Sequence, residues 1–530
     1  MRRLLIRLLW LGLGFVPGLR LLAPSTPAQP AESVARIHFA GFDRVNDDAQ
    51  AGTLKEIWRL PETARLRESV LQKLARAMAG HFRARQENPK QTDCAALLQP
   101  LLEDLLRRES YAEVKRQGPR GHLCTLAIQL DADRRRIWET NCSQLSTQWS
   151  RVTKTGTNRI AFASSEAWFL LIAHSGAAKS DAAEAESLSF IREVKAKGRP
   201  GPAFEGPWLK ADLDMGRLSH KLPFVADADQ PRVEFTASGK AGRLISQARL
   251  TFPQAMGWQI EKWQVPANTI RDPQGRLMSF VGVQGIARWL NRQPFMQKLR
   301  LDPIPNQAFV WGDSHAPLQL LAAVPVRDVT NFLTRFDAEL RTNWNTVLRE
   351  TDAGEVQFLT NDFRLMWVGL APGIFPYLRP APESAPQFLQ AGLFPLRDAA
   401  TNPPPSDLLD QFARRTNLLY YDWEITQERL TQLRTLIPFL SYILDLHNPD
   451  AASPSFKWLD AIEPKLGNSV TEITADSPRE LKLVRNSQLG LNGLELMALA
   501  YWFESPNFPR VNFEVSLRTA SKPRKQASLP

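Results

Sequence analysis

The sequence predicts an α+β fold in which repeated strand-helix-hairpin units form antiparallel sheets covered by amphipathic helices. Three observations predict it: short apolar strands that continue into helical patterns, alternating segments folded about polar turns, and long helices with one apolar stripe. The chain has 530 residues, which is too long for one ordinary hydrophobic core, because domains usually hold about 100 to 200 residues. We therefore expect at least two globular parts.

Five segments begin with an apolar strand and continue with apolar residues three and four positions apart. They are ARIHFAGFDRV at 35–45, PWLKADLDMGRL at 207–218, FVGVQGIARWL at 280–290, LLAAVPVRDVTNFL at 320–333 and LLYYDWEITQERL at 418–430.

Four further segments alternate on both sides of a polar turn, which predicts β-hairpins. They are NRIAFASSEAWFLLIAH at 158–174, RVEFTASGKAGRLISQARLTF at 232–252, VQFLTNDFRLMWVGLAP at 356–372 and VTEITADSPRELKLVRNS at 470–487. The copies share little identity and their spacing varies, so either duplication or independent evolution of one pattern accounts for the recurrence.

Amphipathic helices are predicted at 64–79, 328–348 and 426–444, with a fourth around 492–503. Each has apolar residues on one face that a sheet or another helix must cover. Their apolar residues are Leu66, Val70, Leu71, Leu74 and Met78; Val329, Phe332, Leu333, Phe336, Leu340, Trp344 and Val347; Leu430, Leu433, Ile437, Leu440 and Leu444; and Leu494, Leu496, Met497 and Leu499.

Domain boundaries are expected at polar or proline-rich stretches. KGRPGPAFEG ends at Gly206, and TNPPPS begins at Thr401. The second stretch is either a boundary or a long loop, because the roughly 125 residues that follow it are enough for a domain but need not form one. We predict a signal peptide at 1–28, an N-terminal α+β domain at 29–200, a central α+β domain at 201–400, a C-terminal α+β unit at 401–515 and a basic tail at 516–530.

The amino terminus has the order of a secretory signal: arginines, an apolar run from Leu8 to Val16, and then small residues and prolines that allow cleavage after Ala28. That run is shorter than the roughly 20 residues that span a bilayer, and no later segment is long and apolar enough. We expect an exported protein, periplasmic or extracellular, whose mature chain has no transmembrane helix. Cleavage removes four arginines and lowers the formal net charge from +11 to +7. These charges form no basic stripe, so nucleic acid is not an expected partner.

The three cysteines, Cys94, Cys124 and Cys142, allow one disulfide in an exported protein and leave one thiol over. Buried thiols are the alternative. Together with His122 they have none of the paired-cysteine spacings of zinc sites, so no metal and no cofactor is predicted.

Catalytic motifs are missing from the sequence: it contains no G-x-S-x-G, S-x-x-K, H-E-x-x-H or P-loop pattern. Paired acids remain, because glycoside hydrolysis needs only two carboxyl groups at a suitable separation. The candidates are Asp212 with Asp214, and Asp422 with Glu424, each on one face of an expected strand. In YYDWE the aromatic rings of Tyr421 and Trp423 point to the other face and are expected in the core.

Two histidines have neighbours that suggest other roles. His38 lies between Ile37 and Phe39 on the first strand, where a half-buried, hydrogen-bonded side chain is expected. His315 follows Asp313 and Ser314 in WGDSHAP, but adjacent residues do not reach the geometry of a catalytic triad.

LLYYDWEITQERL and PKLGNSVTEITADSPREL, together with LMSFVGVQGIARWL, resemble segments of large exported bacterial proteins that are known only as domains of unknown function. The resemblance implies an architecture and a compartment, and it carries no activity, ligand or site.

Three functions therefore stand as hypotheses. The sequence favours a non-catalytic envelope protein with a binding or scaffolding role, whose partner would be an envelope protein, a polysaccharide or a lipid. The alternatives are a periplasmic carrier of a lipid or another apolar ligand, and an envelope hydrolase with a non-obvious acid pair.

Overall fold

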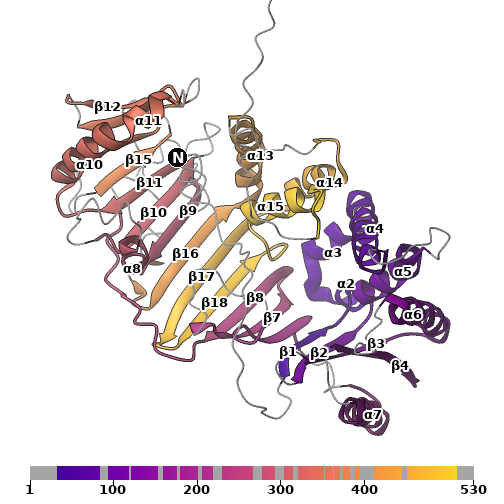
Figure 1. The fold of residues 1–530 in the computed structure, drawn as a ribbon. Helices are drawn as coiled ribbons and strands as arrows, with labels where there is room; N and C mark the ends of the chain where they lie inside the picture. The colour runs from indigo at the N-terminus through magenta and orange to yellow at the C-terminus, as the bar shows by residue number, and fades with distance from the viewer. Residues whose placement is uncertain are drawn as a thin grey trace, which may run out of the picture.

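A computed structural model describes residues 33–83, 93–117, 121–152, 159–175, 180–200, 206–218, 229–266, 277–292, 304–313, 320–350, 353–361, 363–370, 374–381, 388–393, 411–412, 414–443 and 450–509. Within these residues, eighteen strands form one antiparallel sheet (Figure 1). The coarse prediction of an α+β protein built on antiparallel strands is confirmed. The signal peptide, His315 and the basic tail lie outside the described residues.

The strands lie in the spatial order β4, β5, β3, β2, β1, β6, β7, β8, β18, β17, β16, β9, β10, β11, β15, β14, β13 and β12. Their bounds are β1 Ser33–Phe39, β2 Ser110–Gln117, β3 Gly121–Gln129, β4 Arg159–Ser165, β5 Trp168–Ser175, β6 Leu209–Asp214, β7 Arg232–Lys240, β8 Arg243–Thr251, β9 Leu277–Gln284, β10 Gln307–Asp313, β11 Leu320–Pro325, β12 Glu355–Leu359, β13 Arg364–Val368, β14 Tyr377–Pro380, β15 Phe388–Gly392, β16 Leu418–Ile425, β17 Asn468–Ser477 and β18 Glu480–Ser487.

The described helices are α2 Phe42–Asp47, α3 Gly52–Trp58, α4 Pro61–Arg83, α5 Cys94–Arg107, α6 Ala132–Val152, α7 Ser180–Lys197, α8 Ala287–Asn291, α10 Val329–Asn343, α11 Asn345–Glu350, α13 Thr426–Ile443, α14 Pro454–Ile462 and α15 Gly493–Glu504, with short 3₁₀ turns η1 Ala49–Ala51 and η3 Glu463–Lys465.

All four predicted hairpins form, as β4–β5, β7–β8, β12–β13 and β17–β18. One helix prediction was wrong, and a second helix is interrupted. Residues 215–218 form turns after β6, because the amides of Arg217 and Leu218 both bond to the Asp214 carbonyl. The helix expected at 328–348 is divided at Trp344 into α10 and α11.

The C-terminal strands lie in the middle of the sheet. β18 pairs with β8 and β16 pairs with β9, so β16, β17 and β18 lie between two strands that are consecutive in the sequence. Figure 1 shows these orange and yellow strands between the magenta ones. The predicted division at Gly206 and Thr401 therefore falls between strands of one continuous sheet.

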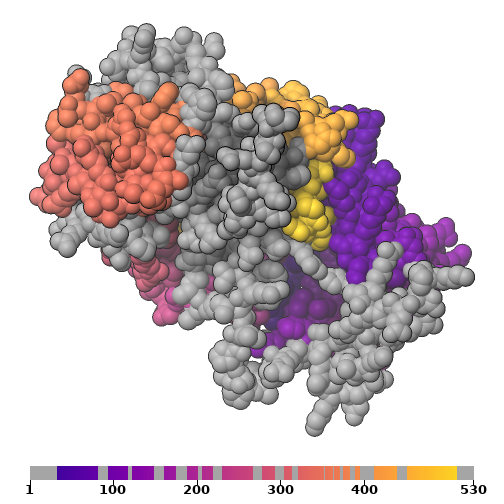
Figure 2. Space-filling model, turned by 45° about the horizontal axis from the view of Figure 1, so that its top comes forward, coloured from indigo at the N-terminus to yellow at the C-terminus, as the bar shows by residue number. Residues whose placement is uncertain are grey.

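The two faces of the sheet differ. We call the face that carries Ile128 and Phe169 the helix face, because these side chains pack under α5 and α6. Paired residues on neighbouring strands point to the same face of the sheet. Following these pairs from Phe169 on β5 to β16 shows that Asp422 also lies on the helix face. On the opposite face, α7 packs on Trp168 and Leu170. In Figure 2 the purple N-terminal part of the surface lies beside the yellow C-terminal part.

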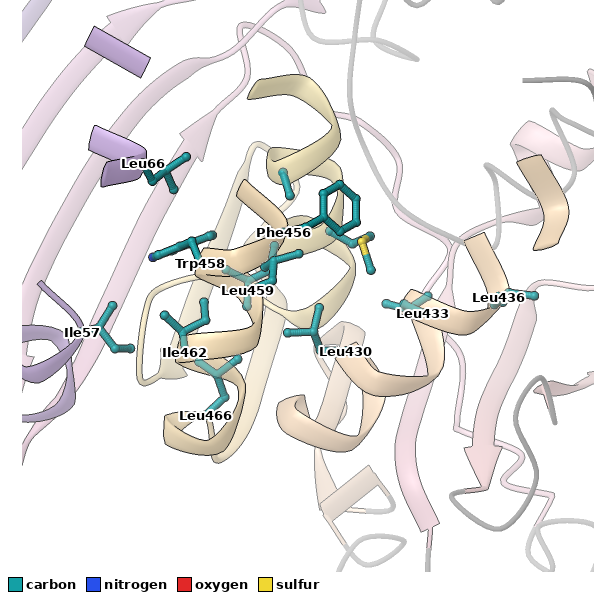
Figure 3. Packing of buried hydrophobic residues seen from close by; sticks show 13 residues of the cluster. Ile57, Leu66, Leu430, Leu433, Leu436, Phe456, Trp458, Leu459, Ile462 and Leu466 are labelled. Carbon is teal, nitrogen blue, oxygen red and sulfur yellow. The ribbon is translucent and has the colours of Figure 1, made fainter. Parts of the chain in front are cut away.

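A cluster of buried apolar side chains joins helices from both ends of the sequence. Figure 3 shows Ile57 of α3 and Leu66 of α4 beside side chains of α13 and α14. The C-terminal members of this cluster are Leu430, Leu433, Leu436, Phe456, Trp458, Leu459, Ile462, Leu466, Leu496, Met497 and Ala500. A second cluster lies on the opposite face, where Tyr421 packs with Phe412, Phe280 and Trp311. The helix layer and the sheet thus each connect distant parts of the chain.

Candidate functional site: a buried carboxylate cluster

Asp422 and Glu424, the acid pair predicted from YYDWE, lie side by side on the helix face of β16. The alternation of the strand puts Tyr421 in the apolar cluster of the opposite face, and Trp423 packs against that cluster, as the sequence predicts. Both carboxylates are buried beneath the helices, with exposed fractions of 2% for Asp422 and 0% for Glu424. Their location is therefore the interior of the protein.

One guanidinium holds both acids. Arg429, in the first turn of α13, places its Nη1 atom 3.2 Å from Asp422 Oδ1 and 2.9 Å from Glu424 Oε2. Only 11% of the Arg429 side chain is exposed. A buried carboxylate requires a partner of this kind, because an unpaired charge in the interior is strongly destabilising.

The amino terminus of α15 supplies the remaining donors. The Gly493 amide donates to Glu424 Oε1 at 2.7 Å, and Asn492 Nδ2 donates to Asp422 Oδ2 at 3.1 Å. A carboxylate is favoured here because the first amides of a helix have no partner within the helix. Glycine at 493 permits the approach, since an added Cβ would lie only 3.3 Å from the Leu430 amide nitrogen. The acids thus anchor α15 to β16.

A second arginine extends the network to the hairpin. Asn492 and Glu495 form a capping box at the start of α15. Arg485 of β18 donates from Nη2 to Glu495 Oε1 at 2.9 Å and from Nε to Thr471 Oγ1 of β17 at 2.8 Å. The cluster therefore ties all three C-terminal strands to α13 and α15.

The pKa values follow from this burial. Desolvation has the largest effect and raises the pKa of Glu424, Arg429 lowers it, and the Asp422 carboxylate raises it; the net direction is upward. Desolvation lowers the pKa of Arg429, but Glu424 and Asp422 together raise it above its ordinary value. Desolvation and Asp422 likewise raise the pKa of Tyr420. The cluster thus contains three carboxyl groups, those of Asp422, Glu424 and Glu495, and two guanidinium groups, those of Arg429 and Arg485.

This geometry does not suit catalysis by the pair. A general acid or nucleophile must reach the bond that breaks, and both carboxyl groups are covered and already hold protein donors. The arrangement is a structural junction. The sequence contained one signal of it, the N-x-x-E capping pattern at Asn492 and Glu495, but Arg429 and Arg485 have no local pattern that marks them.

The other predicted acids lie apart from this cluster. Asp212, on the opposite face of β6, accepts a hydrogen bond from Arg232 Nε at 2.7 Å, and Asp214 pairs with Arg217 at 3.1 Å. Both acids are partly exposed at the surface of the sheet. Asp212 thus belongs to an ion pair between β6 and β7, and Asp214 belongs to an ion pair within the turn that follows β6.

His38 is half-buried and hydrogen-bonded, as predicted. Its Nε2 atom lies 3.0 Å from Glu109 Oε1, and its ring stacks on Tyr111 with the centroids 3.8 Å apart. The Tyr111 hydroxyl donates to the same Glu109 oxygen at 3.1 Å. Burial raises the pKa of Glu109, but the hydrogen bonds from His38 and Tyr111 lower it. Together with the nearby positive charges they outweigh burial, so the pKa of Glu109 is lowered overall.

The three cysteines are not joined by a disulfide in this structure, and Cys94 and Cys142 are buried whereas Cys124 is exposed. Burial raises the pKa of the Cys142 thiol to about 12. Within the described ranges, no group of three or more His, Cys, Asp or Glu side chains could hold a metal ion. Nor does any helix in the same ranges have the length and apolarity to cross a membrane.

A small polar cavity of about 130 Å³ is lined by Glu103, Asp104, Arg107, Arg108 and Arg134. Its buried acid is fully engaged: Asp104 accepts from Arg134 Nη2 at 2.7 Å and from Trp138 Nε1 at 2.8 Å. This ion-pair cluster fixes α5 against α6.

In the described residues the protein is therefore an α+β protein with one antiparallel sheet, and its acid pair Asp422 and Glu424 lies in a buried structural cluster. No family model matches the chain, and no curated protein or solved structure is significantly similar to it.

Proposed function

We propose that this chain is an exported, non-enzymatic envelope protein that works as a binding or scaffolding surface. The observation that carries the proposal is an apolar strip on the helix face of seven neighbouring strands. The strip consists of Val114, Ala35, Leu213, Val233, Leu250, Leu481 and Ala475 in one row, and Ala112, Ile37, Ala211, Phe235, Ala248, Leu483 and Ile473 in the next.

The strip is incompletely covered. Ile37 is 41% exposed, and Phe235, Leu250 and Leu483 are partly exposed. The buried cluster that α2, η1 and α3 form against the sheet reaches β8 at Leu244, beyond the long side of the strip that Ala248 borders. Exposed apolar patches of several hundred Å² are typical of interaction sites. This supports a binding role.

The sealed acid cluster supports the non-enzymatic part of the proposal, because the predicted acids are used to hold the fold together. Of the two other hypotheses, the apolar strip favours the carrier of a lipid or another apolar ligand as the second candidate. The burial of Asp422 and Glu424 counts against the hydrolase.

We also propose that the strand-helix-hairpin order reflects repeated units. The order occurs where α2 to α5 lie between β1 and the pair β2–β3, where α6 lies between β3 and the pair β4–β5, and where α13 and α14 lie between β16 and the pair β17–β18. Export would follow from the predicted signal, and a mature chain that begins at Gln29 in the periplasmic fraction would support it.

Thiol labelling inside the envelope tests the binding role. In a Cys124→Ser background, Ile37→Cys introduces a thiol into the strip and Arg36→Cys introduces one on the opposite face of the same strand. We expect maleimide to label Ile37→Cys several-fold more slowly in intact envelopes than in purified protein, with no such change for Arg36→Cys. Equal rates for Ile37→Cys in the two preparations would contradict the proposal.

A further inference from the structure

We draw no further inference here: the strongest candidate, the apolar strip on the helix face of β2, β1, β6, β7, β8, β18 and β17, carries nothing beyond the proposed binding role, because nothing in the described residues shows what covers it.

Discussion

Arg429 is the residue on which the buried cluster depends, because it is the cation that contacts both Asp422 and Glu424. Isolated in sequence, it looks like an ordinary charge on an amphipathic helix. Its role arises because α13 begins at Thr426, directly after β16, so the first turn of the helix returns Arg429 to the acids of the strand. The acid pair could be predicted from the sequence, whereas its partner depends on this turn and could not.

Replacing Arg429 with methionine should lower the free energy of unfolding by about 3 to 5 kcal/mol, because it leaves buried carboxylates without their cation. Urea denaturation measures the change. Arg434→Met on the same helix is the matched control: Arg434 pairs with Asp460 and Glu463 at the surface, where ion pairs contribute about 0 to 1 kcal/mol. Equal losses for the two variants would contradict the structural role of the cluster.

Glu424→Gln should change the pH dependence of stability. The folded pKa of Glu424 is raised, so the folded state binds its proton more tightly than the unfolded state does. Stability from this group is present below the unfolded pKa of about 4.3 and is lost as pH rises through the raised folded value. The wild type should therefore lose stability relative to Glu424→Gln as the pH rises above the unfolded pKa, by at most about 1.4 kcal/mol per pH unit. Urea denaturation at several pH values measures this difference. If the wild type instead gains stability relative to Glu424→Gln as the pH rises, the raised pKa of Glu424 is wrong.

The elements of this fold are mostly visible in local sequence patterns. Alternation and turn residues predict the four hairpins, and apolar spacing predicts α4, α13 and α15. The helices α5, α6, α7 and α14 were not predicted. The apolar residues of α6, such as Trp138 and Cys142, are few and lie among charged and polar residues. The sequence therefore shows no clear apolar face, and the buried side of α6 is recognised only from its packing against α5. The apolar residues from Val329 to Val347 keep a helical spacing that includes Trp344. This spacing does not indicate that the helix is interrupted at Trp344.

Asn492 has two roles at the start of α15: it caps the helix and it donates a hydrogen bond to Asp422. Asn492→Ala removes the bond to the Glu495 amide and the bond to Asp422, and we expect a loss of about 2 kcal/mol. Asp93→Ala removes a simple cap from α5, and a loss of about 1 kcal/mol is expected. Hydrogen exchange should show that Asn492→Ala also loosens β16. Exchange confined to α15 would indicate that the cap has no part in the buried cluster.

At the scale of the whole molecule, the C-terminal strands join the two halves of the sheet. Their register with β8 and β9 involves residues more than a hundred positions away in the sequence, so no local pattern encodes it. The same is true of the apolar strip. Each contributing strand shows an ordinary alternation, and only the strand order places the seven apolar segments side by side.

A chain that ends at residue 410 should lose protection in the middle of the sheet. Without β16 to β18, the strands β8 and β9 become open edges, and unpaired edges exchange their amides and promote aggregation. Hydrogen exchange monitored by mass spectrometry should show faster exchange in β8 and β9 than in the full chain. β3 and β5, which pair with each other far from the removed strands, serve as internal controls. Unchanged protection in β8 and β9 would mean that the C-terminal strands do not hold the sheet together.

Photocrosslinking inside the living cell tests most directly whether the apolar strip is the working surface. A benzophenone amino acid is placed at Phe235 in the strip or at Thr236 on the opposite face, and the full-length protein is expressed in its native host cell. We predict a crosslinked product from position 235 and none from position 236. Crosslinking from position 236 alone, or from neither position, would contradict the assignment of the strip as the binding surface.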